Sequence, residues 1–587
     1  MNLVTADNFT LVKKDGKINI FIGSWCLSND KIKENFNKDT DKIAKYHWDD
    51  KEKMFKDIIY IEKIYKYFLK KLSKNLNDFH NTNYNSESWE TLIGLWLRYY
   101  ISFLFDRWEQ VSSVEKNYKI SEAQIVEFDE ERFITSNLYD FQYMIFHSNW
   151  NHWIFGKIIE NKSKFNFSLI KDKDQLNKSP IIAKEGKNFF IRFFNKIFAG
   201  IIFKQKLAIA NLYLPKLYKF GLLYKYNKFI AKLDFDKKLK KNVNINSRIE
   251  FFKNITGIDD FSNFALSLIY LNMPCSYLEN FKALNKKIED SILPKKPKII
   301  FTSIEHVCND FFQLYCIKKK TEGAKLVVFQ HGSHFVNKNS LGDDLEADVT
   351  DKFLTWGTSP KPNKTEPLFI SSVIKKKIKK KFFNKGILIS HFMPFDFPGH
   401  YDSSPRYYSD TVTYNNTISS LLSNIDKKIF LSSNIKVNKD LSEQYKIFWP
   451  IKFLKKNFPG IKLISCRDPV WKISNKYKIV VETHNSTGFL EDMYLNIPVI
   501  LLIDPKVNQF KSEYESYYED LKKVKILHYD GENAAKFINS IYDNPLKWWN
   551  EKNTQKVRKI FCSKFAMHKK NPYEELVNTL NSVLNRN

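Results

Sequence analysis

Three absences narrow the class of this 587-residue protein. Its six cysteines include no Cys-x-x-Cys pair, so they form no disulfide framework and suit a reducing compartment. The polar N-terminus lacks the apolar core of a secretory signal. The most apolar candidate span, 193–215, carries three lysines, whereas a membrane-crossing helix needs about 20 mostly apolar residues. We therefore expect a cytoplasmic protein, either soluble or lying on a membrane surface.

Common nucleotide and metal motifs are also missing. The chain has no Walker A sequence and no Gly-x-Gly-x-x-Gly. An Asp-x-Asp match at 234–236 sits among lysines and does not follow a nucleotide-binding βαβ unit. His147 and His152 are five residues apart, so they do not share a helical face, and no third ligand accompanies them. We expect no metal and no resident cofactor.

Acidic residues are outnumbered, with 65 Asp and Glu against 94 Lys and Arg, a formal net charge of +29. This excess has three interpretations: a compositional bias, attraction to an anionic membrane at about 1 kcal/mol per basic residue, or nucleic-acid binding. The lysines are spread along the chain without an RNA-binding aromatic signature or zinc-finger spacing. We therefore rank nucleic acid last and expect no nucleic-acid partner.

The pattern of the N-terminal half predicts one short strand followed mainly by helices. A strand is expected at 18–26, helices over about 52–110, and mainly helix over 130–290. From about residue 296 the expected elements alternate between strand and helix, since strands at 298–303 and 325–333 flank an amphipathic helix at 305–320. A further strand follows at 351–357. This βαβ order predicts a parallel sheet.

A second α/β region follows the proline-rich segment 358–367, which resembles a domain boundary. Strands are expected at 386–391, 428–433, 461–465, 478–483, 498–503 and 525–529, with helices at about 409–423, 440–456, 488–496, 508–522 and 532–542. We predict an α/β fold of two Rossmann-like domains facing a cleft, with a largely helical N-terminal elaboration. The expected divisions are 1–365 (helical insertions at about 52–290, Rossmann-like part at 296–357), a linker at 366–384, a C-terminal domain at 385–560 and a helical tail at 561–587.

One polar loop stands where such a sheet would bind a ligand. It follows the strand at 478–483 and leads into a helix whose first N–H groups and dipole favour an anion. Its donors and its glycine are Thr483, His484, Asn485, Ser486, Thr487 and Gly488. Simple N-capping is the alternative. Glu491 lies four residues after Thr487 and five after Ser486, which is not capping-box spacing, so it could bind ribose hydroxyls.

The same string, with Pro498 after it, resembles the donor-binding signature of GT-B glycosyltransferases. In the plant secondary-product enzymes of that class, the His, Asn and Ser hold the donor phosphates and the Glu holds the ribose. This sequence departs from the signature, because residues between His484 and Asn485 are missing and Glu491 lies further along. Arg467, which follows a strand end, is a further candidate contact to the donor.

A wider resemblance covers most of the chain. The motifs "FIGSWC", "YHWDD", "WETLIGLWLRYYISFLFDRW", "FQHGS", "DKFLTWG", "ETHNSTGFLE" and a late "WW" resemble a family of transferases encoded in bacterial O-antigen and surface-polysaccharide loci. The resemblance implies sugar transfer by a GT-B enzyme. It places nucleotide-sugar binding in 385–560 and the acceptor side in 1–365, and it leaves the donor open.

The motif "FQHGS" ends a strand of the first Rossmann-like half and is expected to face the cleft. Its members are Gln330, His331, Gly332 and Ser333. A histidine there could act as general base on an acceptor hydroxyl, because its ordinary pKa of about 6.5 suits that task. It could instead bind a phosphate or carboxylate, or simply close the strand. Glu346 and Asp348 could orient it.

Two N-terminal motifs supply rival candidates. His47, Asp49 and Asp50 precede a helix, and either aspartate is a rival general base or a plain helix cap. Gly23, Ser24 and Trp25 are assigned to the acceptor side, with packing as the alternative for Trp25.

The sequence therefore predicts an inverting, metal-independent GT-B glycosyltransferase. It would move a sugar from a nucleotide sugar, with a CMP-linked Kdo or nonulosonate slightly favoured, to a lipid-linked or polysaccharide acceptor. The expected location is the anionic inner face of the bacterial inner membrane. Alternatives are a CDP-polyol phosphotransferase of the teichoic-acid type, a sugar-nucleotide epimerase, and a non-catalytic basic scaffold or nucleic-acid binder.

Overall fold

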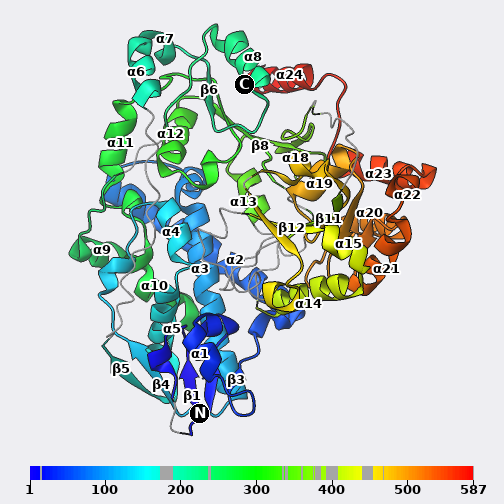
Figure 1. The fold of residues 1–587 in the computed structure, drawn as a ribbon. Coiled ribbons are helices and arrows are strands. Elements are labelled where there is room, and N and C mark those ends of the chain that lie inside the picture. Colours follow the sequence, from blue (N-terminus) through cyan, green and yellow to red (C-terminus); the bar gives the residue numbers. More distant parts are fainter. Residues whose placement is uncertain are drawn as a thin grey trace.

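The computed structural model describes the chain with some gaps. Residues outside the description are 14–15, 172–188, 236–238, 333–335, 337–341, 359–360, 375, 377–384, 392–407, 439–453, 467 and 586–587. Three parallel sheets follow one another along the chain and are covered by helices (Figure 1).

The first sheet lies at the N-terminus and was mostly missed by the sequence analysis. Its strands are β1 (Asn2–Val4), β2 (Asn19–Phe21), β3 (Lys42–Ile43), β4 (Glu122–Val126) and β5 (Asn166–Ile170), in the order β3-β2-β1-β4-β5. Only the strand at 18–26 was expected. The others are at most five residues long and lie between long helices, so period-2 patterns have little room to appear.

Long helices pack over and beyond this sheet. The predicted pair are α2 (Lys51–His80) and α3 (Ser86–Asn117), each with a side-chain N-cap, Asp50 and Asn85. The many aromatic residues of α3 are largely buried, as predicted. The remaining N-terminal helices are α1 (Asp30–Asn35), α4 (Leu138–Met144), α5 (Ser148–Lys162), α6 (Phe189–Ile197), α7 (Ala199–Phe203), α8 (Lys216–Asn227), α9 (Ile245–Phe252), α10 (Asp260–Asn272) and α11 (Phe281–Glu289).

The second sheet contains the predicted βαβ unit. Its strands are β6 (Leu207–Ala210), β7 (Ile299–Thr302), β8 (Lys325–Phe329), β9 (Lys352–Thr355) and β10 (Thr365–Pro367), in the order β10-β9-β8-β7-β6. Helix α12 (Asp310–Thr321) connects β7 to β8, and α13 (Gly342–Asp348) precedes β9. Strand β6 comes from the stretch expected to be mainly helical.

The third sheet has the strand order β13-β12-β11-β14-β15-β16. Its strands are β11 (Lys385–Ser390), β12 (Asn434–Asn438), β13 (Lys462–Cys466), β14 (Tyr477–Glu482), β15 (Val499–Leu502) and β16 (Leu527–His528). Its helices are α14 (Tyr408–Asn424), α15 (Lys427–Ser432), α18 (Val470–Ser474), α19 (Thr487–Tyr494), α20 (Ser512–Lys523), α21 (Gly531–Ile541) and α22 (Pro545–Trp549).

One predicted strand of this region is wrong. Residues 428–433 form most of α15, and the strand is the following segment, β12. The apolar composition suggested a strand, but burial in α15 is one-sided, with Ile429 buried and Leu431 exposed. Most of the helix expected at 440–456 lies outside the described residues.

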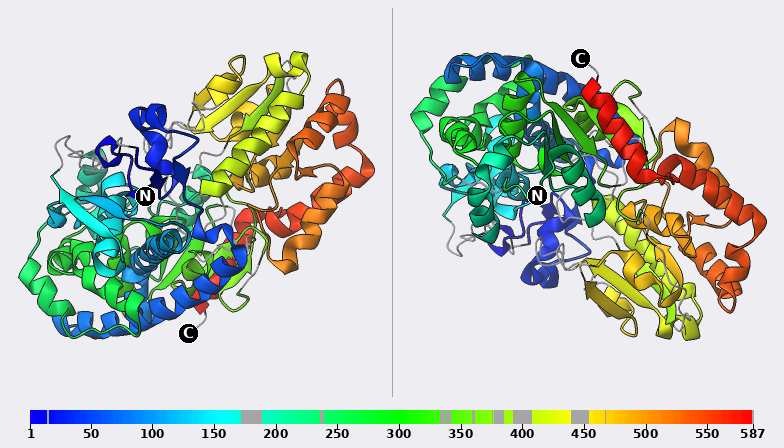
Figure 2. Two further views of the ribbon diagram at one scale, coloured as in Figure 1. Left: turned by 90° about the horizontal axis from the view of Figure 1, so that it is seen from below. Right: turned by 90° about the horizontal axis from the view of Figure 1, so that it is seen from above.

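The tail is helical, as expected, and runs back toward the second sheet. It comprises α23 (Lys552–Phe565) and α24 (Pro572–Asn585). The Thr579 hydroxyl donates to Glu366 in β10 at 2.7 Å, and the Tyr226 hydroxyl in α8 donates to Asn581 at 2.8 Å. In Figure 2, α24 (red) accordingly lies against the N-terminal two-thirds of the chain.

The second sheet separates two apolar cores. Leu326 and Val328 face the core shared with the N-terminal helices, whereas Val327 and Phe329 face the core shared with the third sheet. This alternation is the period of two that a strand buried on both faces requires. The predicted fold class is confirmed, namely α/β with two Rossmann-like sheets and a helix-rich N-terminal part, to which a third parallel sheet is added. Among the described helices, none is long and apolar enough to cross a bilayer.

Candidate functional site

The third sheet reverses its winding between β11 and β14. Chain order runs outward from β11 to β12 and β13 on one side, and from β14 to β15 and β16 on the other. In open parallel sheets, ligands bind at the carboxyl ends of the strands at such a point. Ser390, Glu482 and Lys436 lie side by side there, because Ser390 pairs in register with both other residues.

Glu482 is the buried end residue of β14 and was not singled out from the sequence. Burial raises the pKa of its carboxyl to about 8, while the Ser390 hydroxyl and the charge of Lys436 lower it. Its carboxyl oxygen lies 2.7 Å from the position that a Cβ on Gly488 would occupy. Glycine at 488 therefore lets the first turn of α19 approach this carboxyl closely.

Two more carboxyls come from α19. Burial raises the pKa of Glu491 to about 7, with the nearby Ser372 hydroxyl acting in the opposite direction. Burial, Glu482 and Glu491 raise the pKa of Asp492 well above its ordinary value, and neither oxygen of Asp492 has a hydrogen-bond partner. Because Ser372 belongs to the segment that joins the second and third sheets, Glu491 lies at the boundary between them.

Two histidines lie at the same strand ends. His391 follows β11, is 5% exposed, and has no hydrogen-bond partner for either ring nitrogen. Burial and the neighbouring His484 lower its pKa to about 3. Burial and Lys436 lower the pKa of His484 to about 4. Both rings are therefore neutral near pH 7 and can donate or accept hydrogen bonds without adding charge.

The polar loop does not cap its helix with a side chain. Ser486 occupies the N-cap position of α19 without a side-chain capping bond. Thr483 instead donates to the Ser390 carbonyl at 2.7 Å and contacts the Tyr414 hydroxyl at 2.6 Å, and Asn485 donates to the Tyr518 hydroxyl at 2.8 Å. Thr483 and Asn485 thus hold the loop in place. The N-terminus of α19 has no side-chain cap from Ser486.

The second sheet brings a histidine pair to its carboxyl edge. His331 follows β8, and its Nδ1 lies 3.7 Å from Glu346 Oε2. The same oxygen is 2.9 Å from Nε2 of buried His306. Of the two carboxylates predicted to orient His331, Glu346 lies within ion-pair distance of it, whereas Asp348 pairs with Lys361 at 2.7 Å. His306 was missed, although "EHVC" directly after a predicted strand was an available signal.

Gln330 has a structural role next to His331. Its side chain accepts from the Trp356 N–H at 2.6 Å and donates to the Gly332 carbonyl at 2.7 Å. Ser333 and Arg467, two other candidates, lie outside the described residues. Further along the same loop, the Val336 carbonyl accepts from the N–H of Lys511 in the third-sheet region at 2.9 Å. The chain that follows His331 therefore contacts the third-sheet region at Val336.

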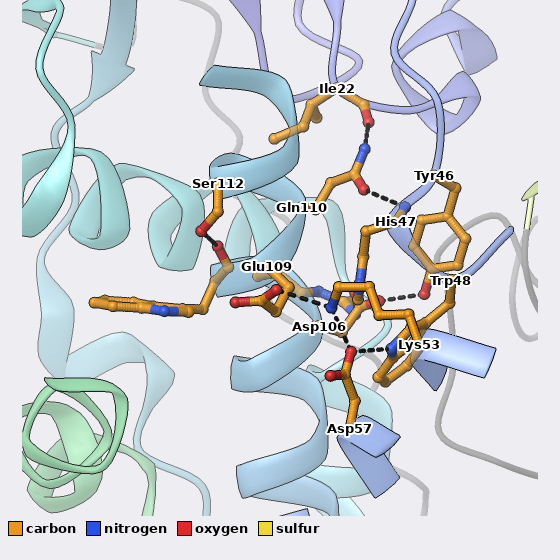
Figure 3. A network of polar contacts seen from close by, with 12 residues as sticks. Ile22, Tyr46, His47, Trp48, Lys53, Asp57, Asp106, Glu109, Gln110 and Ser112 are labelled. Atoms are coloured by element: carbon orange, nitrogen blue, oxygen red, sulfur yellow. Dashed lines mark hydrogen bonds and ion pairs between the residues drawn. The ribbon is translucent and has the colours of Figure 1, made fainter. Parts of the chain in front are cut away.

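In the "YHWDD" motif, His47 belongs to a buried network of hydrogen bonds and ion pairs (Figure 3). His47 Nε2 is 3.1 Å from Asp106 Oδ1, and Arg107 donates to Asp106 Oδ2 at 2.5 Å. Although burial acts in the opposite direction, Arg107, His47 and Tyr46 together hold the pKa of Asp106 below its ordinary value. The His47 N–H also donates to Gln110 at 3.0 Å. These contacts join the N-terminal sheet to α3.

The remaining N-terminal candidates make contacts that stabilise local structure. Asp50 caps α2 by accepting from the Lys53 N–H at 3.0 Å, and exposed Asp49 precedes it. Trp25 stacks on Phe155 at 6.3 Å, and its ring lies where a Cβ on Gly23 would stand. Half-buried Ser24 opens the short helix that contains Trp25.

One group of possible metal ligands occurs in the described part of the chain. Single atoms of His47, Asp57 and Glu109 lie within 4.8 Å of one another. The Lys53 ammonium, however, pairs with Asp57 and lies 2.8 Å from Glu109 (Figure 3). A cation therefore already balances these carboxylates.

The doubly wound third sheet, with buried polar groups at its switch point, defines an α/β protein. The chain belongs to the LIC12162 family transferases, whose model matches residues 1–580. None of the curated proteins compared with the chain matches it.

Solved structures resemble parts of the chain at low identity. TarM is 16% identical with a TM-score of 0.32, covering 49% of this chain and 54% of its own, so the chain spans about half the length of TarM. Anabaena HepE, solved with UDP-glucose, is 10% identical with a TM-score of 0.34 over 64% of this chain and 99% of its own. The wall teichoic acid polymerase TagF is 7% identical with a TM-score of 0.30, over 67% and 92%. Similarities at this level leave the donor and the acceptor open.

Proposed function

We propose that this transferase is a GT-B glycosyltransferase that uses a nucleotide sugar. The observation that carries the proposal is the set of buried polar groups at the β11/β14 switch point. A phosphate ester would meet the uncapped N-terminus of α19 and the neutral rings of His391 and His484. Glu491, at the boundary of the two sheets, would accept hydrogen bonds from the ribose hydroxyls.

The chemistry proposed is a direct, inverting displacement without a metal. His331 is the proposed base for the acceptor hydroxyl, and Glu346 would stabilise the imidazolium that forms. His306, bonded to the same Glu346 oxygen, would hold that carboxylate in place. The α19 N-terminus would stabilise charge on the departing phosphate. The rival bases Asp49 and Asp50 are exposed, and Asp50 already caps α2.

The proposed acceptor is a lipid-linked or surface-polysaccharide saccharide at the cytoplasmic face of the bacterial inner membrane. The +29 charge supports such a location by attraction to anionic lipid. A CMP-linked Kdo or nonulosonate is the first donor to test. No nucleic-acid partner is proposed.

A binding screen with CMP, UDP, GDP and CDP tests the donor site by calorimetry. We expect one nucleotide to bind, and Glu491→Ala to weaken it. Glu513→Ala is the matched control, because it removes an exposed carboxylate in the first turn of α20. Failure of all four nucleotides to bind overturns the proposal.

Turnover with the donor so identified tests the base. We expect His331→Ala to lower kcat about 10²- to 10⁴-fold while leaving the nucleotide Kd unchanged. Mass spectrometry of the product separates sugar transfer from polyol-phosphate transfer, and turnover without acceptor would indicate an epimerase. An unchanged kcat in His331→Ala excludes this histidine as the base.

A further inference from the structure

The stretch 186–233 has an unusual charge pattern. It contains ten basic residues and no aspartate or glutamate. Within it lie α6, α7, β6 and α8. Helices α6, α7 and α8 lie at the end of the molecule opposite the N-terminus (Figure 1).

Helix α6 presents an apolar stripe to solvent. Phe190, Phe193, Phe194 and Ile197 follow the three- and four-residue spacing of one helical face and are 84%, 59%, 40% and 61% exposed. On a helix of a globular protein, a stripe with this spacing ordinarily faces the core. Exposed Ile201 in α7 continues it.

Helix α8 has a second exposed apolar face. Tyr218 and Leu222 pack into the core, whereas Leu217, Phe220 and Tyr224 are 81%, 47% and 61% exposed. The rings of Phe194 in α6 and Phe229, just after α8, stack at a centroid distance of 6.1 Å and connect the two helices. We call the exposed apolar residues of α6, α7 and α8, together with the exposed lysines among them, the apolar-basic face.

Lysines alternate with these apolar residues along the sequence. Exposed members are Lys196, Lys204, Lys206, Lys216, Lys225, Lys228 and Lys232. Burial and the charges of Lys216 and Lys232 lower the pKa of Lys219, as expected where positive charge accumulates. No acidic residue between 186 and 233 is available to neutralise this charge.

We propose that the apolar-basic face binds the surface of an anionic lipid bilayer. An amphipathic helix with aromatic and aliphatic residues on one face and lysines beside them can lie in the interface plane, with its apolar face among the acyl chains. The lysines would then meet the anionic headgroups. Exposed apolar residues gathered in this way mark a docking surface, and the positive charge among them favours lipid phosphates over a second copy of the same face.

Binding in this way would orient the second sheet. Helix α8 packs against β6, the edge strand of the sheet whose strand β8 precedes His331. Lipid binding would therefore hold that sheet near the bilayer, where a lipid-linked acceptor would be found. Only this consequence rests on the proposed function, because the lipid contact itself requires no donor.

Sedimentation of the full chain with lipid vesicles tests the proposal. We expect binding to phosphatidylglycerol-containing vesicles and at least tenfold weaker binding to vesicles of phosphatidylcholine alone. Phe190→Ser combined with Leu217→Ser should lower the partition coefficient at least tenfold. Lys216→Glu combined with Lys225→Glu should abolish the preference for anionic vesicles. Ile59→Ser is the matched control, since Ile59 is 73% exposed on α2, outside the face.

Circular dichroism confirms that each variant is folded, and nucleotide binding is measured in parallel. Lipid binding without nucleotide binding overturns the proposed function alone. Equal binding to both vesicle types overturns the lipid proposal, as does unchanged binding of both double variants. So does a concentration-dependent dimer that the Phe190/Leu217 variant abolishes, because the face would then be an interface between copies of this chain.

Discussion

The first and third sheets share a strand order, but the polar side chains at their switch points differ in their hydrogen bonding. The orders β3-β2-β1-β4 and β13-β12-β11-β14 correspond strand for strand. At the first switch point, the Val126 N–H donates to His152 Nε2 at 3.0 Å, so Nδ1 carries the proton and donates to Thr5 Oγ1 at 2.7 Å. At the third, His391 has no partner for either nitrogen.

Acidic groups show the same contrast. Asp106, beside the first sheet, is held by Arg107, His47 and Tyr46, and its pKa is lowered. Glu482, Glu491 and Asp492 at the third sheet have raised pKa values. Buried polar groups in native proteins are normally paired. His152 and Asp106 at the first sheet follow this rule, whereas His391, Glu482 and Asp492 at the third have the unpaired atoms expected of a ligand site.

The largest expected effect is on the pH dependence of stability. Carboxyls have a pKa of about 4 when unfolded, so between about pH 5 and 8 the folded chain binds more protons at the raised groups. The contribution of these carboxyls to the unfolding free energy therefore falls as pH rises, by up to about 1.4 kcal/mol per pH unit for each group. Glu482→Gln removes one group and should make urea-unfolding stability fall less steeply over this window.

Asp106→Asn is the control for this slope. The pKa of Asp106 is lowered, so its stabilising contribution is complete above the unfolded value and is lost only in acid, as pH falls through the folded value. Its removal should lower stability by a constant amount between pH 5 and 8. Parallel curves for wild type and Glu482→Gln would show that Glu482 is already ionised in this range.

His152→Ala should be the next largest effect. It leaves buried Thr5 and the Val126 N–H without partners, at about 1–3 kcal/mol for each group. We expect a loss of about 2–4 kcal/mol in unfolding free energy by urea denaturation. The nucleotide Kd of the folded protein should not change, and a change would mean that the first switch point also binds ligand.

His391→Ala should reverse that pattern. Removing a ring whose nitrogens have no hydrogen-bond partners leaves no bonded group unsatisfied, and the main loss is its edge contact with Tyr414. The unfolding free energy should therefore fall less than in His152→Ala. Nucleotide affinity should fall about tenfold, which corresponds to about 1.4 kcal/mol and can be measured by calorimetry. A stability loss as large as that of His152→Ala would make His391 an ordinary core histidine and remove the contrast.

The sequence predicted the third sheet well and the first poorly. Strand β15 is a continuous apolar run and β14 contains the apolar run Ile479–Val481, which is the pattern of a parallel strand buried on both faces. Strand β3 has two residues and β1 has three, and short strands carry too little pattern to be separated from loop. Strand β12 was displaced because the adjacent helix α15 is also apolar.

The sequence analysis named His331 and the loop before α19 because both follow strand ends, and Glu491 because of its spacing from that loop. Their roles stay predictions. Glu482 was missed because a charged residue that ends an apolar strand reads as its solvent-exposed end, and its burial depends on the approach of α19 at Gly488. Asp106 was missed for a similar reason, since its contacts with His47 and Tyr46 cross about sixty residues of sequence.

The smallest expected effect concerns Asp50, on the first-sheet side of the comparison. If polar groups there are structural, Asp50→Ala should cost about 1 kcal/mol of unfolding free energy through loss of the α2 cap. Asp50→Asn should retain the cap and the stability, because asparagine caps helices as well as aspartate does. Both variants should keep kcat within about twofold of wild type, as only a general base depends on the lost charge. A fall of about 10²-fold or more in Asp50→Asn, with stability intact, would instead move the base to the N-terminal side of the protein.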